Sequence, residues 1–427
     1  MDTTAAGLLS HLSIDCDRLI DRIERLAKIG QQPTGSIRRL AFTPEDLQAR
    51  YLVQQWMNEV GMTVRIDAAG NLIGRYAGTI ENAPALATGS HIDTVPSGGQ
   101  FDGVLGVLAG IEIVHTLHEQ QIRLQHPLEV IVFTDEESSM IGCQAIAGTV
   151  LTQAPDRYQP SIGRSIQDCL DTIGGNWTAI TTAQQSRSEI AAFIELHVEQ
   201  GIVLEHQQTA IGVVEGVVGM QRHKITITGQ ANHAGTTPMH LRQDALVAAA
   251  HIILAVQKIA HQMPSHPVAT VGYLEVSPNA VNIIPGKVEL SVDLRDLSSA
   301  CLNDMMQQLK MAIEQIATTT QTTITTTPLL CVEPSLAAKH IQTTIANICQ
   351  QLDLSYCSLP SRAGHDALEM GRLTDMGMIF VPSQSGISHS GAEYTSPEHC
   401  VQGANVLLHT LLALDQFYPD TSSALDD

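Results

Sequence analysis

The chain has few basic residues, no closely paired cysteines and no long hydrophobic run. Its 427 residues include 23 Lys and Arg against 44 Asp and Glu, a formal net charge of −21 at pH 7. A surface of that sign repels nucleic-acid phosphates and anionic lipid headgroups. We therefore expect no nucleic-acid partner and no membrane partner. An anionic substrate would need local positive charge from a metal or an Arg.

None of the eight cysteines stands in a C-x-x-C pair, which argues against a thiolate zinc knuckle. No apolar run reaches the ~18 residues of a membrane span, and residues 1–17 lack the pattern of a signal peptide. We therefore expect a cytoplasmic protein whose cysteines are mostly buried and reduced. The chain is also long enough for two domains, each with its own core.

Strand and helix patterns alternate along the first part of the chain. Helical spacing occurs near 19–26, 43–61 and 104–117, and the second of these helices is expected to start with Thr43 as its cap and Pro44 at its first position. Strand patterns occur near 63–66, 71–76, 85–88 and 129–134. Nearly continuous apolar strands separated by helices are typical of an α/β domain with a mostly parallel sheet. The same pattern returns after Leu330, so residues 1–212 and 331–427 are predicted to form one discontinuous domain that binds two metals.

The segment 213–330 has a different order of elements. Strand patterns near 223–228, 268–276, 287–294 and 322–327, with helices near 241–259 and 302–316, give β-α-β-β-α-β, the ferredoxin-like unit. The Thr-rich run Ala317–Thr327 is either a low-complexity stretch or an edge strand, and the strand propensity of Thr favours the strand. We expect an inserted ferredoxin-like domain.

Five residues able to bind metals lie at predicted strand ends or in the loops that follow. They are His91, Asp102, Glu137, His197 and His389. In an open α/β sheet the ligand crevice lies beyond the carboxyl ends of the strands, so residues remote in sequence can meet there. Imidazole and carboxylate ligands without thiolates suit zinc, with manganese or cobalt as alternatives. Each residue alone is unremarkable, but the set predicts a two-metal hydrolase.

Two further carboxylates stand beside these residues. His91 and Asp93 are two apart in an extended segment, so their side chains can point the same way. A metal-bound imidazole usually donates its other N–H to a carboxylate, and Asp93 is the candidate partner. Glu136 directly precedes Glu137 after a buried strand, so one carboxylate can bind metal while Glu136 serves as general base toward a metal-held water.

These motifs resemble the M20 clan of metal-dependent amidohydrolases and peptidases. The similarity runs from Leu19 to Leu414 and is closest to the branch of N-carbamoyl-L-amino acid hydrolases, allantoate amidohydrolases and β-ureidopropionases. Peptidases of the clan usually have Asp where this chain has His197. The stretches typical of the branch are ELHVEQG (195–201), GQANHAGTTPM (229–239), NAVNIIPG (279–286) followed by DLR (293–295), and GHDA (364–367).

The resemblance implies how the metals are held. One metal would be bound by His91 and His197 and the other by Glu137 and His389. Asp102 would bridge the two metals.

The resemblance also implies the residues that contact the substrate. These would be Gln200, Asn282 and Arg295, and the Arg guanidinium can grip an α-carboxylate through two hydrogen bonds. His233 would stabilise the oxyanion from a partner subunit. That role implies a homodimer formed through the inserted domain.

The implied activity is hydrolysis of the ureido C–N bond of a small N-carbamoyl amino acid or related ureido acid, releasing ammonia and CO2. Two departures from the branch concern the substrate pocket: Ser138 replaces the usual Gly, and Gly391 replaces the usual Pro. One alternative is an aminoacylase or dipeptidase on the same scaffold, which His197 and segment 232–235 disfavour. Another is a catalytically silent binding protein, which the intact ligand set with Glu136 disfavours.

Overall fold

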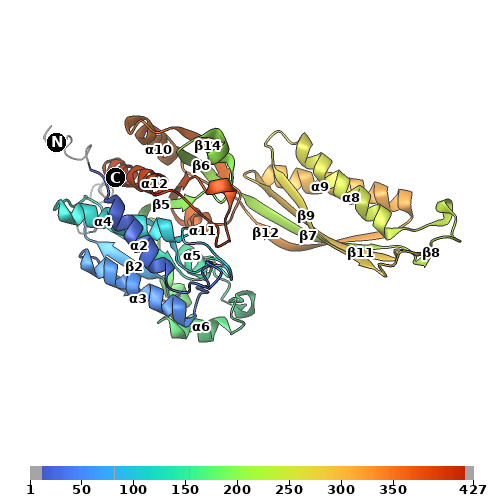
Figure 1. Cartoon of the computed structure of the whole chain (residues 1–427), viewed down its shortest axis with the longest axis horizontal. Helices are drawn as coiled ribbons and strands as arrows, with labels where there is room; N and C mark the ends of the chain where they lie inside the picture. Colours follow the sequence, from blue (N-terminus) through green and yellow to red (C-terminus); the bar gives the residue numbers. More distant parts are fainter. Residues whose placement is uncertain (1–11, 81, 153, 419–427) are drawn as a thin grey trace, which may run out of the picture. The chain divides into compact units, whose positions relative to one another are not determined.

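The computed structural model describes residues 12–80, 82–152 and 154–418. The chain divides into two compact units, drawn in Figure 1: residues 1–216 with 336–427, and residues 217–335. The sequence placed these divisions at 212/213 and 330/331. Residues 1–11, which belong to the segment predicted to lack a signal peptide, lie outside the described residues. All eight cysteines are free thiols, and four of them are buried.

The first unit contains a nine-stranded sheet in the order β1-β2-β4-β3-β5-β15-β6-β13, with β14 beside β6. The four central strands β4, β3, β5 and β15 are parallel. The β2 and β6 strands join them antiparallel. The unit is therefore α/β with a mostly parallel centre, as expected. The strands are β1 Thr63–Ile66, β2 Leu72–Tyr76, β3 Ala85–His91, β4 Leu128–Phe133, β5 Ile190–Val198, β6 Ile211–Val217, β13 Ser335–Leu336, β14 Tyr356–Ser361 and β15 Asp375–Val381.

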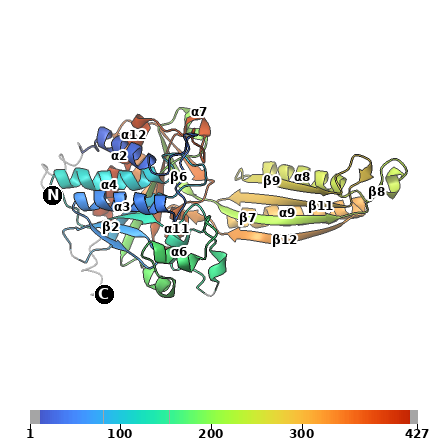
Figure 2. The same cartoon turned by 60° about the horizontal axis from the view of Figure 1, so that its bottom comes forward.

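Helices cover the faces of this sheet. The even-numbered β5 residues Ala192–Val198 join one large hydrophobic core with α2, α3, α4, α10 and α12; α2, α3 and α4 lie side by side in Figures 1 and 2. Odd-numbered β5 residues point to the other face, where Glu195 meets the start of α11. The helices are α2 Cys16–Ala27, α3 Pro44–Glu59, α4 Val104–Glu119, α5 Ile141–Ala147, α6 Ile166–Thr172, α7 Val203–Gln207, α10 Lys339–Gln351, α11 Asp366–Leu373 and α12 Pro397–Phe417.

Helix starts follow local capping chemistry. Thr43 caps α3 by accepting from the Asp46 amide, and Pro44 occupies the first helical position, as the sequence predicts. Ser396 caps α12 in the same way by accepting from the His399 amide. This cap fixes where the loop after β15 ends, and that loop carries His389.

The second unit has the element order β7 (Gly219–Thr228), α8 (Ala245–Gln262), β9 (Val268–Ser277), β11 (Lys287–Asp296), α9 (Ser299–Thr320) and β12 (Thr323–Val332), plus the short strands β8 and β10. Its antiparallel sheet runs β12-β7-β11-β9. Both helices lie on one face of the sheet (Figure 2). Alternate β11 residues, from Val288 to Leu294, point into the core between sheet and helices.

Two expected boundaries in this unit are wrong. The Thr-rich run becomes an edge strand only from Thr323, because α9 continues to Thr320 and Gln321 turns in the left-handed region. The helix expected from 241 begins at Ala245, because Asp244 accepts hydrogen bonds from the first amides as its cap. In both places a local cap sets the boundary.

Among the described residues, α8 is long and apolar enough to cross a membrane by length and composition, with a mean hydropathy of 1.3. One side of it, including Ala248, Ile252 and Val256, is buried in the core of its own unit. We interpret α8 as the core helix of a globular unit.

Candidate functional site

The five predicted metal ligands all lie in the first unit, at the carboxyl ends of its four parallel strands. His91 ends β3, and Asp102 follows in the loop before α4. Glu137 follows β4, His197 lies at the end of β5, and His389 lies in the loop after β15. Parallel strands end at one edge of their sheet, which is why segments so distant in sequence converge.

The five residues form two overlapping groups. The first is His91, Asp102 and His197, and the second is Asp102, Glu137 and His389. Within each group, one ligand atom per residue lies within 4.8 Å of the others. Asp102 belongs to both groups, so the two candidate metal sites are adjacent.

The Asp102 carboxylate faces the two groups with different oxygens. Its Oδ1 lies 3.5 Å from His91 Nε2 and 3.1 Å from His197 Nε2. Its Oδ2 lies 3.3 Å from His389 Nε2, and His389 Nε2 in turn lies 3.7 Å from Glu137 Oε2. A carboxylate that directs one oxygen toward each group of ligands is suited to bridging two cations.

The backbone fixes the orientation of two imidazoles. His91 Nδ1 lies 3.0 Å from the carbonyl oxygen of Asp93, and His197 Nδ1 lies 2.8 Å from that of Val198. Nδ1–H donates to these carbonyls, so each Nε2 is directed toward Asp102, where it can donate to the carboxylate when protonated or offer its lone pair to a metal when neutral. Nitrogen lone pairs beside paired carboxylate oxygens fit a divalent metal of the zinc type.

Asp93 contacts His91 more closely through its backbone than through its carboxylate. Its carboxylate Oδ1 is 3.8 Å from His91 Nδ1, so the backbone carbonyl of Asp93 is the nearer partner of that imidazole. The other carboxylate oxygen accepts from the Glu137 amide at 3.3 Å. Asp93 therefore connects the end of β3 to the Glu136-Glu137 turn.

Glu136 and Glu137 lie at the edge of the cluster, each with a side chain only 9% exposed. Glu136 Oε2 lies 3.6 Å from His91 Nε2. Burial and neighbouring carboxylates raise the pKa of Glu136 well above its usual value, and burial raises the pKa of Glu137 to about 7. Buried acids with raised pKa values are typical of groups that exchange protons.

The carboxylates of the cluster attract positive charge, whether it is carried by a metal cation or by a proton on a histidine. Burial opposes ionisation of Asp102, but hydrogen bonds from three histidines hold its pKa well below the usual value. Burial also opposes protonation of His91, yet the surrounding carboxylates raise its pKa well above normal. The acidic groups therefore supply a strong attraction for positive charge at this edge of the sheet.

Unusual backbone geometry shapes the same place. Gly103 has φ +67°, and a Cβ there would lie 2.5 Å from His91 Nε2, so any side chain would displace the imidazole. Asp135, Gln200 and His389 also have positive φ without being glycine. Such strained residues cluster at functional sites, where the surrounding structure holds them in place.

Gln200 joins the cluster directly. Its Nε2 donates to Asp102 Oδ2 at 2.7 Å and lies 3.3 Å from His389 Nε2. Its Oε1 is buried and meets no donor among the described residues. An amide oxygen held in this way is free to accept a hydrogen bond from a substrate N–H.

Glu393 is a site residue that the sequence did not reveal. Its Oε1 accepts from the amides of Phe101 and Asp102 at 2.8 and 3.0 Å, and its Oε2 accepts from Ser388 Oγ at 3.0 Å. Glu393 thus joins the loop that carries His389 to the loop that carries Asp102. The available signal was Gly99, where a Cβ would lie 2.4 Å from Glu393 Cβ.

The GHDA stretch lies beside β5 and supplies a buried polar layer. Glu195 accepts from Ser90 Oγ at 2.7 Å and from the Ala367 amide at 2.9 Å. The His365 ring centroid is 4.4 Å from that of His197. Asp366 is fully buried, and burial raises its pKa well above the usual value. This layer supports the strand that presents His197.

The remaining predicted residues lie in the second unit, at opposite ends of its sheet. His233 in β8 (Asn232–His233) pairs with Ile283 in β10 (Ile283–Ile284), and the Asn282 carbonyl accepts from the Ala234 amide at 2.9 Å. The side chains of His233 and Asn282 are exposed. Arg295 lies near the far end of β11, roughly 26 Å from Lys287 at ~3.3 Å per residue.

Arg295 is not isolated. Its Nε donates to Asp293 Oδ1 at 2.8 Å, and Arg222 Nη2 lies 2.7 Å from Asp293 Oδ2. The Asp293 carboxylate is thus shared by two guanidinium groups, one from β7 and one from β11.

Ser138 and Gly391, the two departures from the branch pattern, each make a close contact with another loop. Ser138 Oγ lies 2.5 Å from Ser161 Oγ, which joins the turn after Glu137 to the segment before α6. Gly391 packs against Ser36, since a Cβ there would lie 2.7 Å from the Ser36 nitrogen. Both positions therefore lie in close contacts next to the cluster.

Known proteins share this sequence and fold over nearly their whole length. The N-carbamoyl-L-amino acid amidohydrolase of Geobacillus stearothermophilus is 40% identical over 408 residues, covering 94% of this chain and 99% of the relative. The allantoate amidohydrolase of Escherichia coli (strain K12) is 34% identical over 394 residues, covering 91% and 95%. The solved structure of a hydantoinase/carbamoylase family amidase from Burkholderia multivorans matches with a TM-score of 0.90 at 34% identity, covering 96% and 100%.

The family match agrees with these relatives. It spans residues 87–413, a range that includes all five candidate metal ligands and Glu136. The resemblance inferred from the sequence motifs is confirmed: the chain belongs to Peptidase family M20/M25/M40.

Proposed function

We propose that this protein hydrolyses the ureido C–N bond of a small N-carbamoyl amino acid or related ureido acid, using two divalent metal ions and releasing ammonia and CO2. The observation that carries this proposal is the Asp102 carboxylate, which presents one oxygen to His91 and His197 and the other to His389. The printed names of the two relatives, an N-carbamoyl-L-amino acid amidohydrolase and an allantoate amidohydrolase, support the ureido substrate.

In this proposal His91 and His197 would hold one metal, Glu137 and His389 would hold the other, and Asp102 would serve both. Zinc suits these ligands, with manganese or cobalt as alternatives. Bound divalent cations supply Lewis acidity and lower the pKa of a water.

Glu136 moves the proton in this reaction. Its carboxylate, beside His91, accepts the proton of the attacking water, and its raised pKa suits that task. The hydroxide forms a bond to the ureido carbon, and the C–N bond to the amino acid nitrogen breaks. Glu136 then gives its proton to that nitrogen, and the carbamic acid that remains decomposes to ammonia and CO2.

We assign the second unit, residues 217–335, to substrate capture as a ferredoxin-like lid. Gln200 would accept from the ureido group, and Arg295 would bind the substrate carboxylate. Asn282 would also contact the substrate, and His233 would stabilise the oxyanion.

The length of β11 supports a homodimer formed through this unit. His233 and Asn282 are near its start, and Arg295 lies roughly 26 Å further along at ~3.3 Å per residue. A small ureido acid cannot span that distance. One site would therefore take Arg295 from its own chain and His233 with Asn282 from the partner chain.

The test is metal-dependent ammonia release. The purified protein is stripped with a chelator, reloaded with zinc, manganese or cobalt, and assayed on N-carbamoyl-L-amino acids, allantoate and N-carbamoyl-β-alanine. N-acetyl-L-amino acids serve as the control for aminoacylase activity. We expect ammonia from at least one ureido acid, loss of activity on stripping and recovery on reloading. Hydrolysis confined to the acetyl compounds, or no turnover with any metal, would contradict the proposal.

A further inference from the structure

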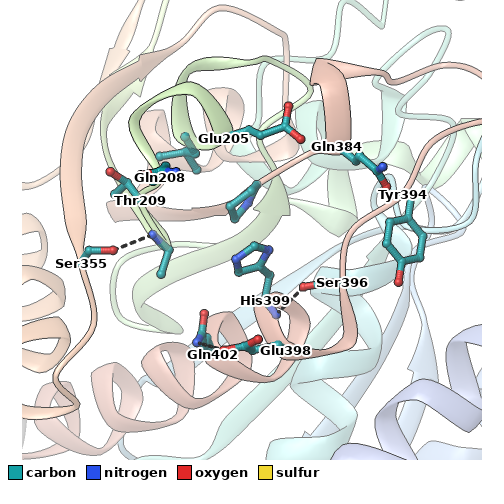
Figure 3. Close-up of a pocket in the computed structure, with 13 residues that line it drawn as sticks. Glu205, Gln208, Thr209, Ser355, Gln384, Tyr394, Ser396, Glu398, His399 and Gln402 are labelled. Carbon is teal, nitrogen blue, oxygen red and sulfur yellow. Dashed lines mark hydrogen bonds between the residues drawn. The ribbon is translucent and has the colours of Figure 1, made fainter.

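An open cavity of about 450 Å³ lies in the first unit, away from the candidate metal ligands. Its walls come from α7, from the start of α12 and from both ends of the loop 382–396 that joins β15 to α12 (Figure 3). Figure 3 shows the His399 ring near the centre of the lining side chains. Cavities of this size accommodate small organic molecules.

The lining residues favour a positively charged ligand. Two carboxylates, Glu205 and Glu398, line the cavity, and none of the described lining residues is Lys or Arg. Burial lowers the pKa of His399, so its imidazole is neutral near pH 7. An anion would meet negative charge with no cation to pair with it. A cation would find two partners.

Hydrogen-bond acceptors and apolar surface complete the cavity. Gln402 donates its Nε2 to Glu398 Oε1 at 3.2 Å, and the polar residues Thr209 and Ser355 also line the cavity. Leu204, Pro382 and Tyr394 supply apolar surface. This combination suits an ammonium group attached to a short hydrocarbon or aromatic body.

One wall of the cavity is the loop that carries His389. Glu205 Oε2 accepts from the Ser385 amide at 2.8 Å, where Ser385 has φ 56°. The Gln384 amide donates to the Tyr394 carbonyl at 2.9 Å, which closes the base of the loop. A cation bound at Glu205 would compete with the Ser385 amide for that carboxylate.

The same loop reaches the metal-ligand cluster at its other end. Ser388 Oγ lies 3.1 Å from Asp102 Oδ2, and His389 Nε2 lies 3.3 Å from the same oxygen. Release of Ser385 from Glu205 would therefore change how firmly His389 is held. The cavity and the cluster share one loop as their common wall.

We propose that this cavity is a regulatory site for a small organic cation, an ammonium with an apolar body and no carboxylate, whose binding alters metal retention through the loop 382–396. The coupling between amine binding and metal retention depends on the proposed function in one respect, which is that His389 is a metal ligand. Binding itself does not depend on that function.

Binding is measured by calorimetry on the zinc-loaded protein with three probes of similar shape: phenethylamine, 3-phenylpropionate and 2-phenylethanol. We expect saturable binding of phenethylamine and at least tenfold weaker binding of the other two, as expected for about one charge-assisted contact. Glu398→Gln should weaken phenethylamine binding about tenfold. The matched control Glu24→Gln, on exposed α2 surface, should leave it unchanged.

Three results would overturn the site: no saturable binding of phenethylamine up to roughly 10 mM, equal binding of 3-phenylpropionate, or equal affinity in Glu398→Gln. Circular dichroism on each variant distinguishes a folding defect from a lost contact. If Glu398→Gln fails to fold, Glu205→Gln takes its place.

Coupling is measured as the rate at which zinc passes to a chelator, without phenethylamine and with phenethylamine near its wild-type dissociation constant. We expect at least a twofold change in that rate in the wild type and in Glu24→Gln, and a clearly smaller change in Glu398→Gln, whose site is then largely empty. An unchanged wild-type rate would overturn the regulatory role. An equal change in Glu398→Gln would show that the amine acts on the metal without binding in the cavity. That result would also overturn the regulatory role. Neither measurement uses turnover, so failure here is distinguishable from failure of the proposed hydrolysis.

Discussion

The candidate metal cluster of the first unit and the proposed substrate residues of the second unit are built in opposite ways. His91, Asp102 and His197 are buried, and backbone carbonyls fix the orientation of the two imidazoles. His233 is exposed in the two-residue strand β8, and Asn282 is exposed directly before its partner strand β10. Buried, crowded charges fix chemistry in place before substrate arrives, whereas exposed polar groups suit contacts made when a ligand or a second chain arrives.

The carboxylates of the two units show the same contrast. Burial raises the pKa of Glu137 in the first unit to about 7. Hydrogen bonds from Lys224 and Lys287 lower the pKa of Glu289 in the second unit to about 2. Near neutral pH, therefore, the first unit exchanges protons while Glu289 stays ionised.

The largest effect should come from Glu136→Gln. The amide keeps the shape of the side chain but cannot accept a proton, so we expect turnover of a ureido acid to fall roughly 10³- to 10⁴-fold. Metal content, measured by atomic emission, should stay at the wild-type level. Near-normal turnover in a correctly metal-loaded variant would contradict the assignment of Glu136 as the general base.

Gly103→Ala tests whether the first unit depends on preorganisation. The new methyl would lie 2.5 Å from His91 Nε2, so we expect metal affinity to fall up to roughly 100-fold. Gly163→Ala is the matched control, because Gly163 has a similar φ of +72° but nothing within 4 Å of its Cβ position. Equal losses in both variants would mean that backbone strain, rather than displacement of His91, causes the effect.

Arg295→Ala tests the second unit. Loss of a charge-assisted contact should lower kcat/KM for an anionic ureido acid roughly 30-fold, with little change for an uncharged ureido compound. Arg222→Ala is the control, because Arg222 pairs with the same Asp293. If Arg222→Ala behaves like Arg295→Ala, the shared Asp293 network rather than a carboxylate contact explains the loss.

The smallest effect concerns pH. Glu137, with a pKa of about 7, is protonated below that pH in the metal-free protein and must lose its proton when a cation binds. Metal affinity should therefore fall as pH drops below 7, by up to about tenfold per unit for each proton displaced. Metal titrations between pH 5 and 8 should show a shallower slope for Glu137→Gln. The slope for Glu289→Gln should stay at the wild-type value, since Glu289 is ionised throughout this range.

The sequence predicts periodic and capped elements well. The alternation of apolar strands with helices predicted the parallel centre of the first unit, and Thr43-Pro44 predicted the start of α3. The short helices α5, α6, α7 and α11 were missed because fewer than nine residues make too few turns to show helical periodicity.

Much of the candidate site was also predictable, because strand ends converge in a parallel sheet. The sequence could not show that His91 donates to the carbonyl of Asp93, since that depends on the backbone turn after β3. Nor could it show Glu393, whose partners lie 291 and 292 residues away. Such contacts arise from tertiary packing and leave only small traces in sequence, such as Gly99.

The length of β11 has a consequence for how activity depends on dimer formation. If Arg295 and His233 contribute to different active sites, a monomer contains no complete substrate-binding site. Specific activity would then decline on dilution, although every metal ligand remained intact. A heterodimer of an Arg295 variant and a His233 variant would then contain one active site with both residues intact, so mixing the two inactive variants would restore part of the activity.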